Sequence, residues 1–403
     1  MNSNLANRNI KLVIIEGIFA NFLLGFLFIW TVMRKPLLEL FPSWTEGMLS
    51  IIFGLHNLFI CIGILLGGKL AVKFSGRFVF KLFGIMASVG LAGFALLPEN
   101  NPELAYVMAF ILFVIVAATG IGFGISSVQS HTIPWIPEKS GMVSGIMYMT
   151  LGLSSVILTF LSRWILPSLG VKMTMFVFGV IIFVIAAIIL LDRDSIKLPP
   201  TDNKNGGAIE LNGFTPKEML KSPIFWIYML WNVGTRTAGL IMLDHVASLS
   251  VSYGLITIIG MLISPCNGLG CISLGTSLDK IGSKKIMLIT SGLMTLAGVS
   301  LVIGHFSDIK VVLLIGILLT GFAYGGSNST YPAMIKNRFG AKHYTENFGF
   351  ANLAIGAASF IESASGTALD AAGGNYLSIM IMMLLVTAPS LICAIVYSFK
   401  KNN

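Results

Sequence analysis

The chain has 403 residues, of which 55% are hydrophobic and 11% are charged. A water-soluble protein of this length needs far more charge on its surface, so the composition excludes that class. The net charge is +9, but twenty of the 26 Lys and Arg residues fall in the termini and in every second loop between apolar stretches. This distribution indicates membrane topology with both termini in the cytoplasm, and it argues against nucleic acid as a partner.

Twelve apolar stretches follow one another, six on each side of one polar segment. Most are about 20 residues or longer, enough for a helix to cross the hydrocarbon layer of a lipid bilayer. We therefore expect an all-α, multi-pass protein of the cell membrane. Its expected parts are an N-terminal six-helix bundle (1–191), a cytoplasmic linker (192–222) and a C-terminal six-helix bundle (223–403). The expected helices cover residues 10–33, 48–70, 78–97, 103–131, 142–168, 171–191, 223–249, 253–277, 286–305, 309–335, 347–370 and 375–398.

The linker is polar, and we expect residues 200–213 to be flexible. From Thr215 its sequence changes to the pattern of a short amphipathic helix at the membrane interface. Thr215 suits the N-cap, Pro216 the first turn and Glu218 the third helical position. The linker therefore ends in a helix just before the second bundle begins.

Two loops at equivalent places in the two halves resemble each other. One begins at Gly68 and the other at Gly275, and in each a glycine and four residues precede a basic turn. Such a repeat is typical of a duplicated six-helix unit. The residues that carry the pattern are Lys73 and Arg77 in the first loop, and Asp279, Lys280 and Gly282 in the second.

These loops, together with five shorter motifs in the right order, resemble those of the major facilitator superfamily, and in particular of the oxalate:formate antiporter and monocarboxylate transporter families. The motifs lie at Trp30–Pro36, Trp135–Gly141, Met219–Trp226, Gly325–Pro332 and Asn347–Gly349. The resemblance implies two pseudo-symmetric bundles, transport by alternating access, and a cytoplasmic gate at the two loops. The first loop departs from the family pattern, because Val72 stands where an acid is expected and Ser75 where a glycine is expected.

A charge inside the hydrocarbon layer is costly unless it is paired or hydrated, so each such residue is a candidate for function. Arg236 lies near the middle of the seventh stretch and offers a planar fork that matches a carboxylate. We expect it to bind the substrate, with hydroxyl donors from Thr235 and Thr237; a structural ion pair is the alternative. Three aromatic residues are further candidates, on helices that line the central path in this superfamily: Trp30, Tyr148 and Tyr324.

Glu362 is matched in depth with Arg236, and we expect the two to pair. Glu362 would then accept a proton and release Arg236 when protonated, and a permanent structural partner is the alternative. Asp244 and His245 lie near the outer end of the same stretch as Arg236, which suits an outer gate or a charge pair. The other intramembrane candidates have local explanations: Glu16 as a cap on the cytoplasmic side, His56 hydrogen-bonded beside Asn57, and His131 at the cytoplasmic surface.

The resemblance also indicates which anion is expected. In the oxalate-transporting members an arginine and a lysine hold the two carboxylates, and the matching positions here are Cys271 and Ile355, neither of which is cationic. One cation then favours a monocarboxylate over oxalate, moved with a proton or by exchange. An amino acid or other zwitterion, and export of a lipophilic compound, remain open.

The chain contains no nucleophile–base pair, phosphate-binding loop or metal-binding motif, so we expect no enzyme activity, cofactor or metal. Its partners are expected to be a small-molecule substrate, the lipid bilayer and a proton, and the protein is expected to be a monomer.

Overall fold

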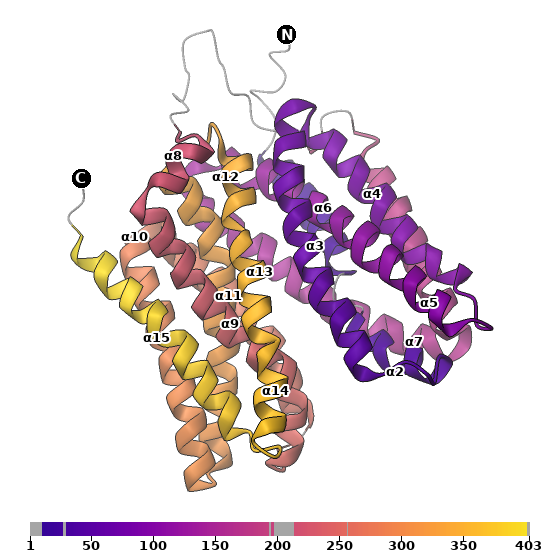
Figure 1. Cartoon of the computed structure of the whole chain (residues 1–403). Coiled ribbons are helices and arrows are strands. Elements are labelled where there is room, and N and C mark those ends of the chain that lie inside the picture. Colours follow the sequence, from indigo (N-terminus) through magenta and orange to yellow (C-terminus); the bar gives the residue numbers. More distant parts are fainter. Residues whose placement is uncertain (1–9, 27–29, 193–194, 197–212, 256, 401–403) are drawn as a thin grey trace. The chain divides into compact units, whose positions relative to one another are not determined.

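A computed structural model describes residues 10–26, 30–192, 195–196, 213–255 and 257–400. The described chain is helical throughout, apart from one isolated β-bridge between Gly213 and Gly340 (Figure 1). The α-helices are α1 (Ile10–Leu24), α2 (Trp30–Leu40), α3 (Glu46–Lys73), α4 (Gly76–Ala92), α5 (Pro102–Ala109), α6 (Ala118–Thr132), α7 (Ser140–Ile189), α8 (Pro216–Lys221), α9 (Pro223–Ser252), α10 (Thr257–Ser307), α11 (Lys310–Phe339), α12 (Tyr344–Ala351), α13 (Leu353–Glu362), α14 (Ala364–Ala371) and α15 (Leu377–Phe399).

Four short helical segments complete the description. Three are 3₁₀-helices, and η3 is a π-helix that continues α5 into α6 without a break. Their bounds are η2 (Gly93–Leu96), η3 (Phe110–Ala117), η4 (Ile133–Trp135) and η5 (Pro137–Lys139). In the described residues each of the twelve apolar stretches lies on these helices, which confirms the all-α fold class. Eight helical segments of the described chain are long and apolar enough to cross a membrane.

Two long helices each contain two of the expected spans, joined at a glycine. Gly170 interrupts α7 with φ 69°, and Gly282 interrupts α10 with φ 78°. A residue with a side chain adopts this left-handed conformation at a cost, whereas glycine adopts it freely. The predicted boundaries at 168–171 and 277–286 are therefore tight glycine turns rather than loops.

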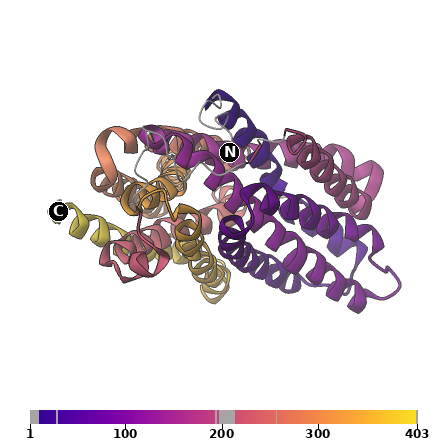
Figure 2. The ribbon, with the colours of Figure 1, turned by 90° about the horizontal axis from the view of Figure 1, so that it is seen from above.

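The helices form two compact units. Unit 1 comprises residues 1–136, 150–213 and 340–352, and unit 2 comprises residues 137–149, 214–339 and 353–403. Within each unit the helices pack side by side, as the view from above in Figure 2 also shows. In unit 2, for example, α15 packs along both α9 and α10. The beginning of α7 thus belongs to unit 2, although the rest of α7 belongs to unit 1.

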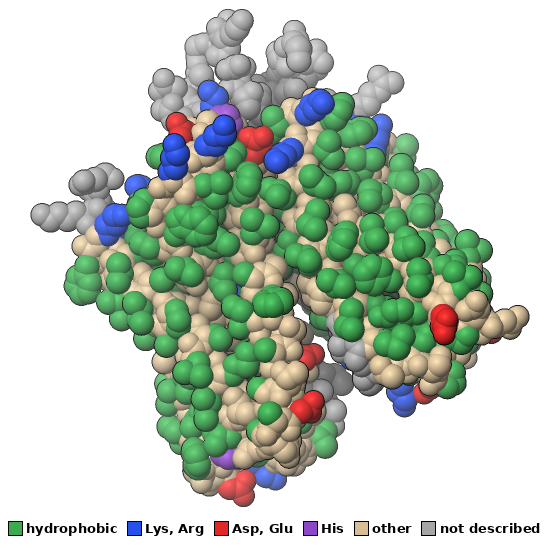
Figure 3. Space-filling model, in the orientation of Figure 1, with side chains coloured by type: hydrophobic (Ala, Val, Ile, Leu, Met, Phe, Trp, Pro, Cys, Tyr) green, Lys and Arg blue, Asp and Glu red, His purple; other side chains and the backbone are tan. Residues whose placement is uncertain are grey.

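The outer surface of the helices is apolar. Hydrophobic side chains cover the flanks in Figure 3, whereas Lys and Arg gather at the end of the helices near α8. Large exposed apolar residues such as Phe160, Trp164 and Leu385 belong to this surface. Such a surface suits lipid and would be unstable in water.

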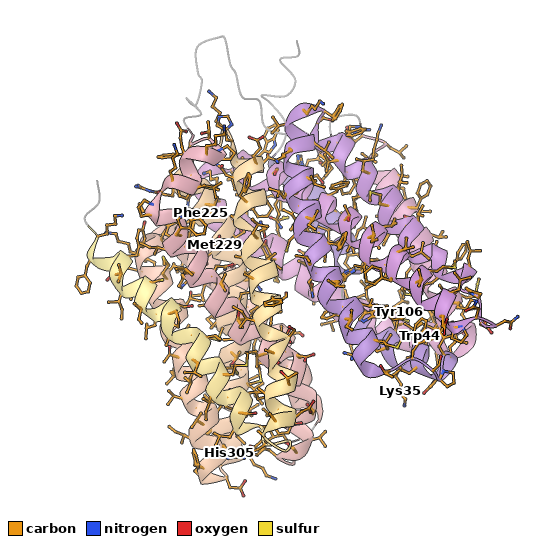
Figure 4. All side chains as sticks on the ribbon, in the orientation of Figure 1. Lys35, Trp44, Tyr106, Phe225, Met229 and His305 are labelled. Atoms are coloured by element: carbon orange, nitrogen blue, oxygen red, sulfur yellow. The ribbon has the colours of Figure 1, made fainter. Side chains whose placement is uncertain are left out.

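The ends of the helices are closed by specific contacts. At the end of unit 1 labelled in Figure 4, Trp44 packs edge-on against Tyr106 and donates its indole N–H to the Pro102 carbonyl at 3.0 Å. At α8 the expected capping box is present, because the Thr215 hydroxyl accepts from the Glu218 amide while the Thr215 amide donates to the Glu218 carboxylate. The expected flexible part of the linker, residues 200–212, lies outside the described residues.

Candidate functional site

Arg236 is a buried cation in the interior of unit 2. It lies 13 residues after the start of α9, which corresponds to about 20 Å along the helix. Only 5% of the residue is exposed, and its Nε atom has no hydrogen-bond partner among the described residues. A buried guanidinium with an unused N–H group is available for an anion.

The hydroxyls of the two threonines beside Arg236 donate to backbone carbonyls. The Thr235 hydroxyl donates to the Trp231 carbonyl at 3.0 Å, and the Thr237 hydroxyl donates to the Val233 carbonyl at 2.7 Å. The shortest bond of each hydroxyl is therefore to its own helix, as is common for buried threonines. The Thr237 hydroxyl also lies 3.5 Å from the Ala358 carbonyl of α13. The two hydroxyls make the surroundings of Arg236 polar, but their hydrogens are already donated to backbone carbonyls and not to a ligand.

Side chains from three other helices of unit 2 meet Arg236. The hydroxyl of Tyr148, on α7, lies within hydrogen-bond range of the guanidinium. Tyr331 on α11 and Cys271 on α10 are also close enough for electrostatic interaction with it. Sequence patterns indicated Tyr148, but they did not single out Tyr331, because a tyrosine at this spacing looks the same whether it faces a neighbouring helix or a site.

Close helix packing brings these groups together. A Cβ atom on Gly145 of α7 would lie 2.5 Å from the Cys271 carbonyl oxygen of α10, and Gly141 approaches Gly275 in the same way. On the opposite side, the Cys271 thiol lies 3.3 Å from the Gly325 carbonyl of α11. Small residues at crossing points let helix backbones approach closely in a membrane.

Tyr324 and Trp30, the two other predicted substrate residues, have different positions. The ring of Tyr324 packs on Gly239 of α9, and its hydroxyl is close enough to Tyr148 for electrostatic interaction, so it belongs to the surroundings of Arg236. Trp30 lies in unit 1, where it is fully buried and stacks on Phe113 with ring centroids 4.5 Å apart.

Acidic residues form a second group in unit 2. Glu362, at the end of α13, interacts electrostatically with Asp244 of α9. Asp244 lies 3.7 Å from the His245 ring, and His245 Nε2 lies 2.9 Å from the Ser365 hydroxyl. The ion pairs of the described chain do not include Arg236 with Glu362. The acidic group is therefore built around Asp244.

The second of the two similar loops, which contains Asp279, Lys280 and Gly282, contacts the beginning of α7. The Asp279 carboxylate accepts hydrogen bonds from the backbone N–H groups of Gly141 and Met142, both at 2.8 Å. Lys336 of α11 lies near enough to interact with Asp279 electrostatically. Lys280 is exposed, and Gly282 forms the turn within α10.

The first of the two similar loops, which contains Lys73 and Arg77, makes different contacts. Arg77, at the start of α4, donates to the Leu190 and Asp192 carbonyls beyond the end of α7, and to the Ser195 hydroxyl at 2.9 Å. Lys73 lies over the ring of Phe74, 5.4 Å from its centroid. Val72, which replaces the family's acid, is 56% exposed. Arg77 therefore binds the C-terminal end of α7. Asp279 of the other loop binds the N-terminal end of the same helix, and each charge is favourable at its end of a helix dipole.

Two of the remaining intramembrane residues differ from expectation. His131 is fully buried, so the prediction that it lies at the surface is wrong; its Nε2 lies 3.3 Å from the Glu16 carboxylate. His56 bonds across to another helix rather than within α3, because its Nδ1 lies 3.0 Å from the Phe113 carbonyl. Both rings point into unit 1.

Comparisons with known proteins agree with this architecture. The profile of the Major Facilitator Superfamily matches residues 13–363. The chain is 24% identical over 358 residues to the uncharacterized MFS-type transporter YhjX of Escherichia coli (strain K12), covering 86% of this chain and 85% of that protein. It is 26% identical over 311 residues to the oxalate:formate antiporter of Oxalobacter formigenes, and this match covers 75% of this chain and 71% of that protein.

A solved structure supports the fold. The proton:xylose symporter XylE, with bound 6-bromo-6-deoxy-D-glucose, superimposes with a TM-score of 0.75 at 14% identity, covering 97% of this chain and 95% of that one. At this identity the likeness concerns the fold alone. Since the family profile spans most of the sequence, this chain is a multi-pass membrane transporter, not an enzyme, and belongs to the major facilitator superfamily.

Proposed function

We propose that the protein carries a small monocarboxylate across the cell membrane by alternating access, with Arg236 as the group that binds the carboxylate. The observation that carries this proposal is the charge of the buried residues. Among the described residues, the buried Lys and Arg side chains are Arg236 and Lys336. Lys336 lies near Asp279, whereas the ion pairs of the described chain leave Arg236 without a carboxylate.

A buried charge without a partner is strongly unfavourable, so a cation in this setting needs an anion. A planar carboxylate can take two N–H groups of a guanidinium at once, and the Tyr148 hydroxyl can donate to the same anion. A single cation neutralises a single carboxylate. This supports a monoanion rather than oxalate, although oxalate and formate are both named for the relative from Oxalobacter formigenes.

The spacing along α9 argues against an α-amino acid. Asp244 lies eight residues after Arg236, about 12 Å further along the helix, and Glu362 lies beside Asp244. The amine and the carboxylate of an α-amino acid are attached to the same carbon atom, so one molecule cannot reach both groups. Asp244 and Glu362, whose carboxyl groups interact with each other, therefore do not support the recognition of an amine.

The test is counterflow in proteoliposomes, with labelled formate, lactate, pyruvate, oxalate and neutral amino acids. We expect exchange of one or more monocarboxylates in the wild type and its loss in Arg236→Gln. Arg236→Lys should restore little, because an ammonium group lacks the planar fork. Arg338→Gln, which removes an exposed cation at the end of α11, is the matched control and should behave as the wild type.

Two results would contradict the proposal. Monocarboxylate exchange that is unchanged in Arg236→Gln would make Arg236 a structural residue. Exchange of amino acids alone would replace the monocarboxylate with a zwitterion as the substrate class.

A further inference from the structure

Three aromatic rings form a stack in the interior of unit 1. The Phe113 ring has the Trp30 ring at 4.5 Å and the His56 imidazole at 4.1 Å, with interplanar angles of 22° and 14°. Two rings cannot stack on the same face of a phenyl ring at these distances, so Trp30 and His56 lie on opposite faces. Both residues are fully buried.

The backbone beneath this stack is unusual. Phe113 belongs to the π-helix η3, and its carbonyl accepts the backbone N–H of Ala118, five residues later. The same carbonyl lies 3.0 Å from Nδ1 of His56. Single π-turns within α-helices often occur at functional sites. Here the π-turn presents a carbonyl oxygen to a histidine of another helix.

This contact fixes the form of the imidazole. A carbonyl oxygen only accepts hydrogen bonds, so Nδ1 of His56 carries the hydrogen. In the neutral ring Nε2 is then an unprotonated acceptor. Nε2 is buried and has no hydrogen-bond partner among the described residues. A basic nitrogen with an unused lone pair therefore lies about 15 Å from the start of α3, near the middle of this helix.

Among the described residues, no charged side chain shows an electrostatic interaction with His56. Within the described chain, the polar group that interacts with it is the Phe113 carbonyl. The elements packed against α3 are α2, η3, α4, α6 and α12, and η3 has no titratable residue. On the other four, the titratable residues are Arg34, Lys35, Glu39, Arg77, Lys81, His131, Tyr344 and Glu346. Besides His56, α3 itself carries Glu46, Cys61, Lys69 and Lys73.

Several of these groups have known partners elsewhere. Lys35 pairs with Glu39, His131 lies against Glu16, and Glu346 lies near His343. Arg77 binds the end of α7. His56 is consequently a titratable group in an aromatic and otherwise uncharged part of unit 1.

We infer that His56 is a proton-binding residue of the transport cycle and that the proton binds at Nε2. This inference rests on the proposed transport of a monocarboxylate and names the ion that accompanies it. The proton comes from water on one side of the membrane and returns to water on the other, while Nδ1 keeps its hydrogen and its bond to Phe113. The protonated ring is a cation facing a phenyl ring, an arrangement that stabilises it.

The burial of Nε2 favours the neutral ring in this conformation, because a buried imidazolium without an anion is unfavourable. Proton binding therefore requires a conformation in which water or an anion reaches Nε2. If water reaches Nε2 of His56 in one conformation and not in the other, proton binding is coupled to the conformational change of the transporter.

The experiment compares two kinds of transport in the same proteoliposomes. Counterflow exchanges labelled for unlabelled substrate and needs no net proton movement, whereas accumulation driven by a pH gradient does. We expect both in the wild type, with accumulation rising by up to about tenfold per pH unit for one proton per substrate. His56→Gln, whose amide can still donate to the Phe113 carbonyl, should keep counterflow and lose the gradient-driven accumulation. His343→Gln is the matched control.

The outcomes separate this inference from the proposed function. Accumulation that persists in His56→Gln, or a wild type that exchanges monocarboxylates without responding to a pH gradient, overturns the role of His56 and leaves monocarboxylate transport intact. The counterflow of Arg236→Gln tests the proposed binding of the carboxylate and not the role of His56.

A second measurement decides the matter if His56→Gln does not fold or if no monocarboxylate is exchanged. The ¹⁵N resonances of the five histidines can be followed in the wild type between pH 5 and 8. Protonation of Nε2 of His56 in this range would support the inference. A ring that stays neutral throughout would refute it.

Discussion

The Asp279 carboxylate lies 2.8 Å from the backbone nitrogen of Gly141, so a side chain of α10 caps the N-terminus of α7. Its second oxygen accepts from the next amide, that of Met142. The first N–H groups of a helix have no partner within the helix, and the helix dipole favours a negative charge there. Asp279 is thus an N-cap of α7 that is supplied by a different helix.

Replacing this carboxylate should loosen the beginning of α7. We expect Asp279→Ala to destabilise the folded protein by about 1–3 kcal/mol, since two charge-assisted hydrogen bonds are lost. Asp279→Asn, which keeps one acceptor oxygen, should have a smaller effect. Thermal unfolding in detergent, followed by tryptophan fluorescence, measures the difference. Lys280→Ala, at the exposed neighbouring position, is the control. Equal unfolding midpoints for Asp279→Ala and Lys280→Ala would contradict the capping role of Asp279.

The hydroxyl of Tyr148 should contribute to binding without being essential to the fold. Tyr148→Phe keeps the ring and removes the group within hydrogen-bond range of Arg236. We expect the Kd for the transported anion to rise about 2–10-fold, the range expected for one hydrogen bond. Tyr106→Phe removes a tyrosine hydroxyl that donates to the Met48 carbonyl in unit 1, and it should leave Kd unchanged. Equal Kd values for both variants would exclude Tyr148 from the site.

The crossing of α7 and α10 should tolerate no side chain at Gly145. A Cβ atom there meets backbone atoms of Cys271 and Ile272, which cannot move as a flexible side chain can. We expect Gly145→Ala to reduce transport and the yield of folded protein. Gly292→Ala is the control, because nothing lies within 4 Å of a Cβ at that position. Normal yield and transport for Gly145→Ala would show that the crossing can open without loss.

Removal of the Arg77 guanidinium should affect the last turn of α7. This side chain binds the Leu190 and Asp192 carbonyls and the Ser195 hydroxyl. In Arg77→Gln we expect the amides near Leu190 to exchange hydrogen faster, because local opening costs less when helix-end carbonyls lose their partners. Lys81→Gln, at an exposed position of α4, should leave exchange as in the wild type. Identical exchange in both variants would mean that the contact does not stabilise the turn.

Much of the fold could be predicted from the sequence, because hydrophobic length alone determines where a chain can cross a bilayer. The capping box at Thr215 was equally predictable, since all its parts lie within four residues. Arg236 stood out for the same kind of reason: a charge within an apolar stretch is visible without any knowledge of its neighbours.

The partners of these residues could not be predicted in this way. Tyr331, Cys271 and the Asp279 cap depend on which helices cross and at which depth, and no local pattern encodes a crossing point. His131 was assigned to the surface because it lies near a helix end, but the contact with Glu16 of α1 depends on tertiary packing. The expected pairing of Arg236 with Glu362 rests on their similar depth along their helices. Whether the two side chains face each other depends on how each helix is rotated in the packed structure, which the sequence does not indicate.

The distribution of α7 between the two units bears on how the molecule could be divided. Residues 137–149 belong to the compact unit otherwise formed by the second half of the sequence, and residues 340–352 belong to the one formed by the first half. A break in the linker would therefore produce two fragments that each lack a segment of their own core and carry a segment of the other's.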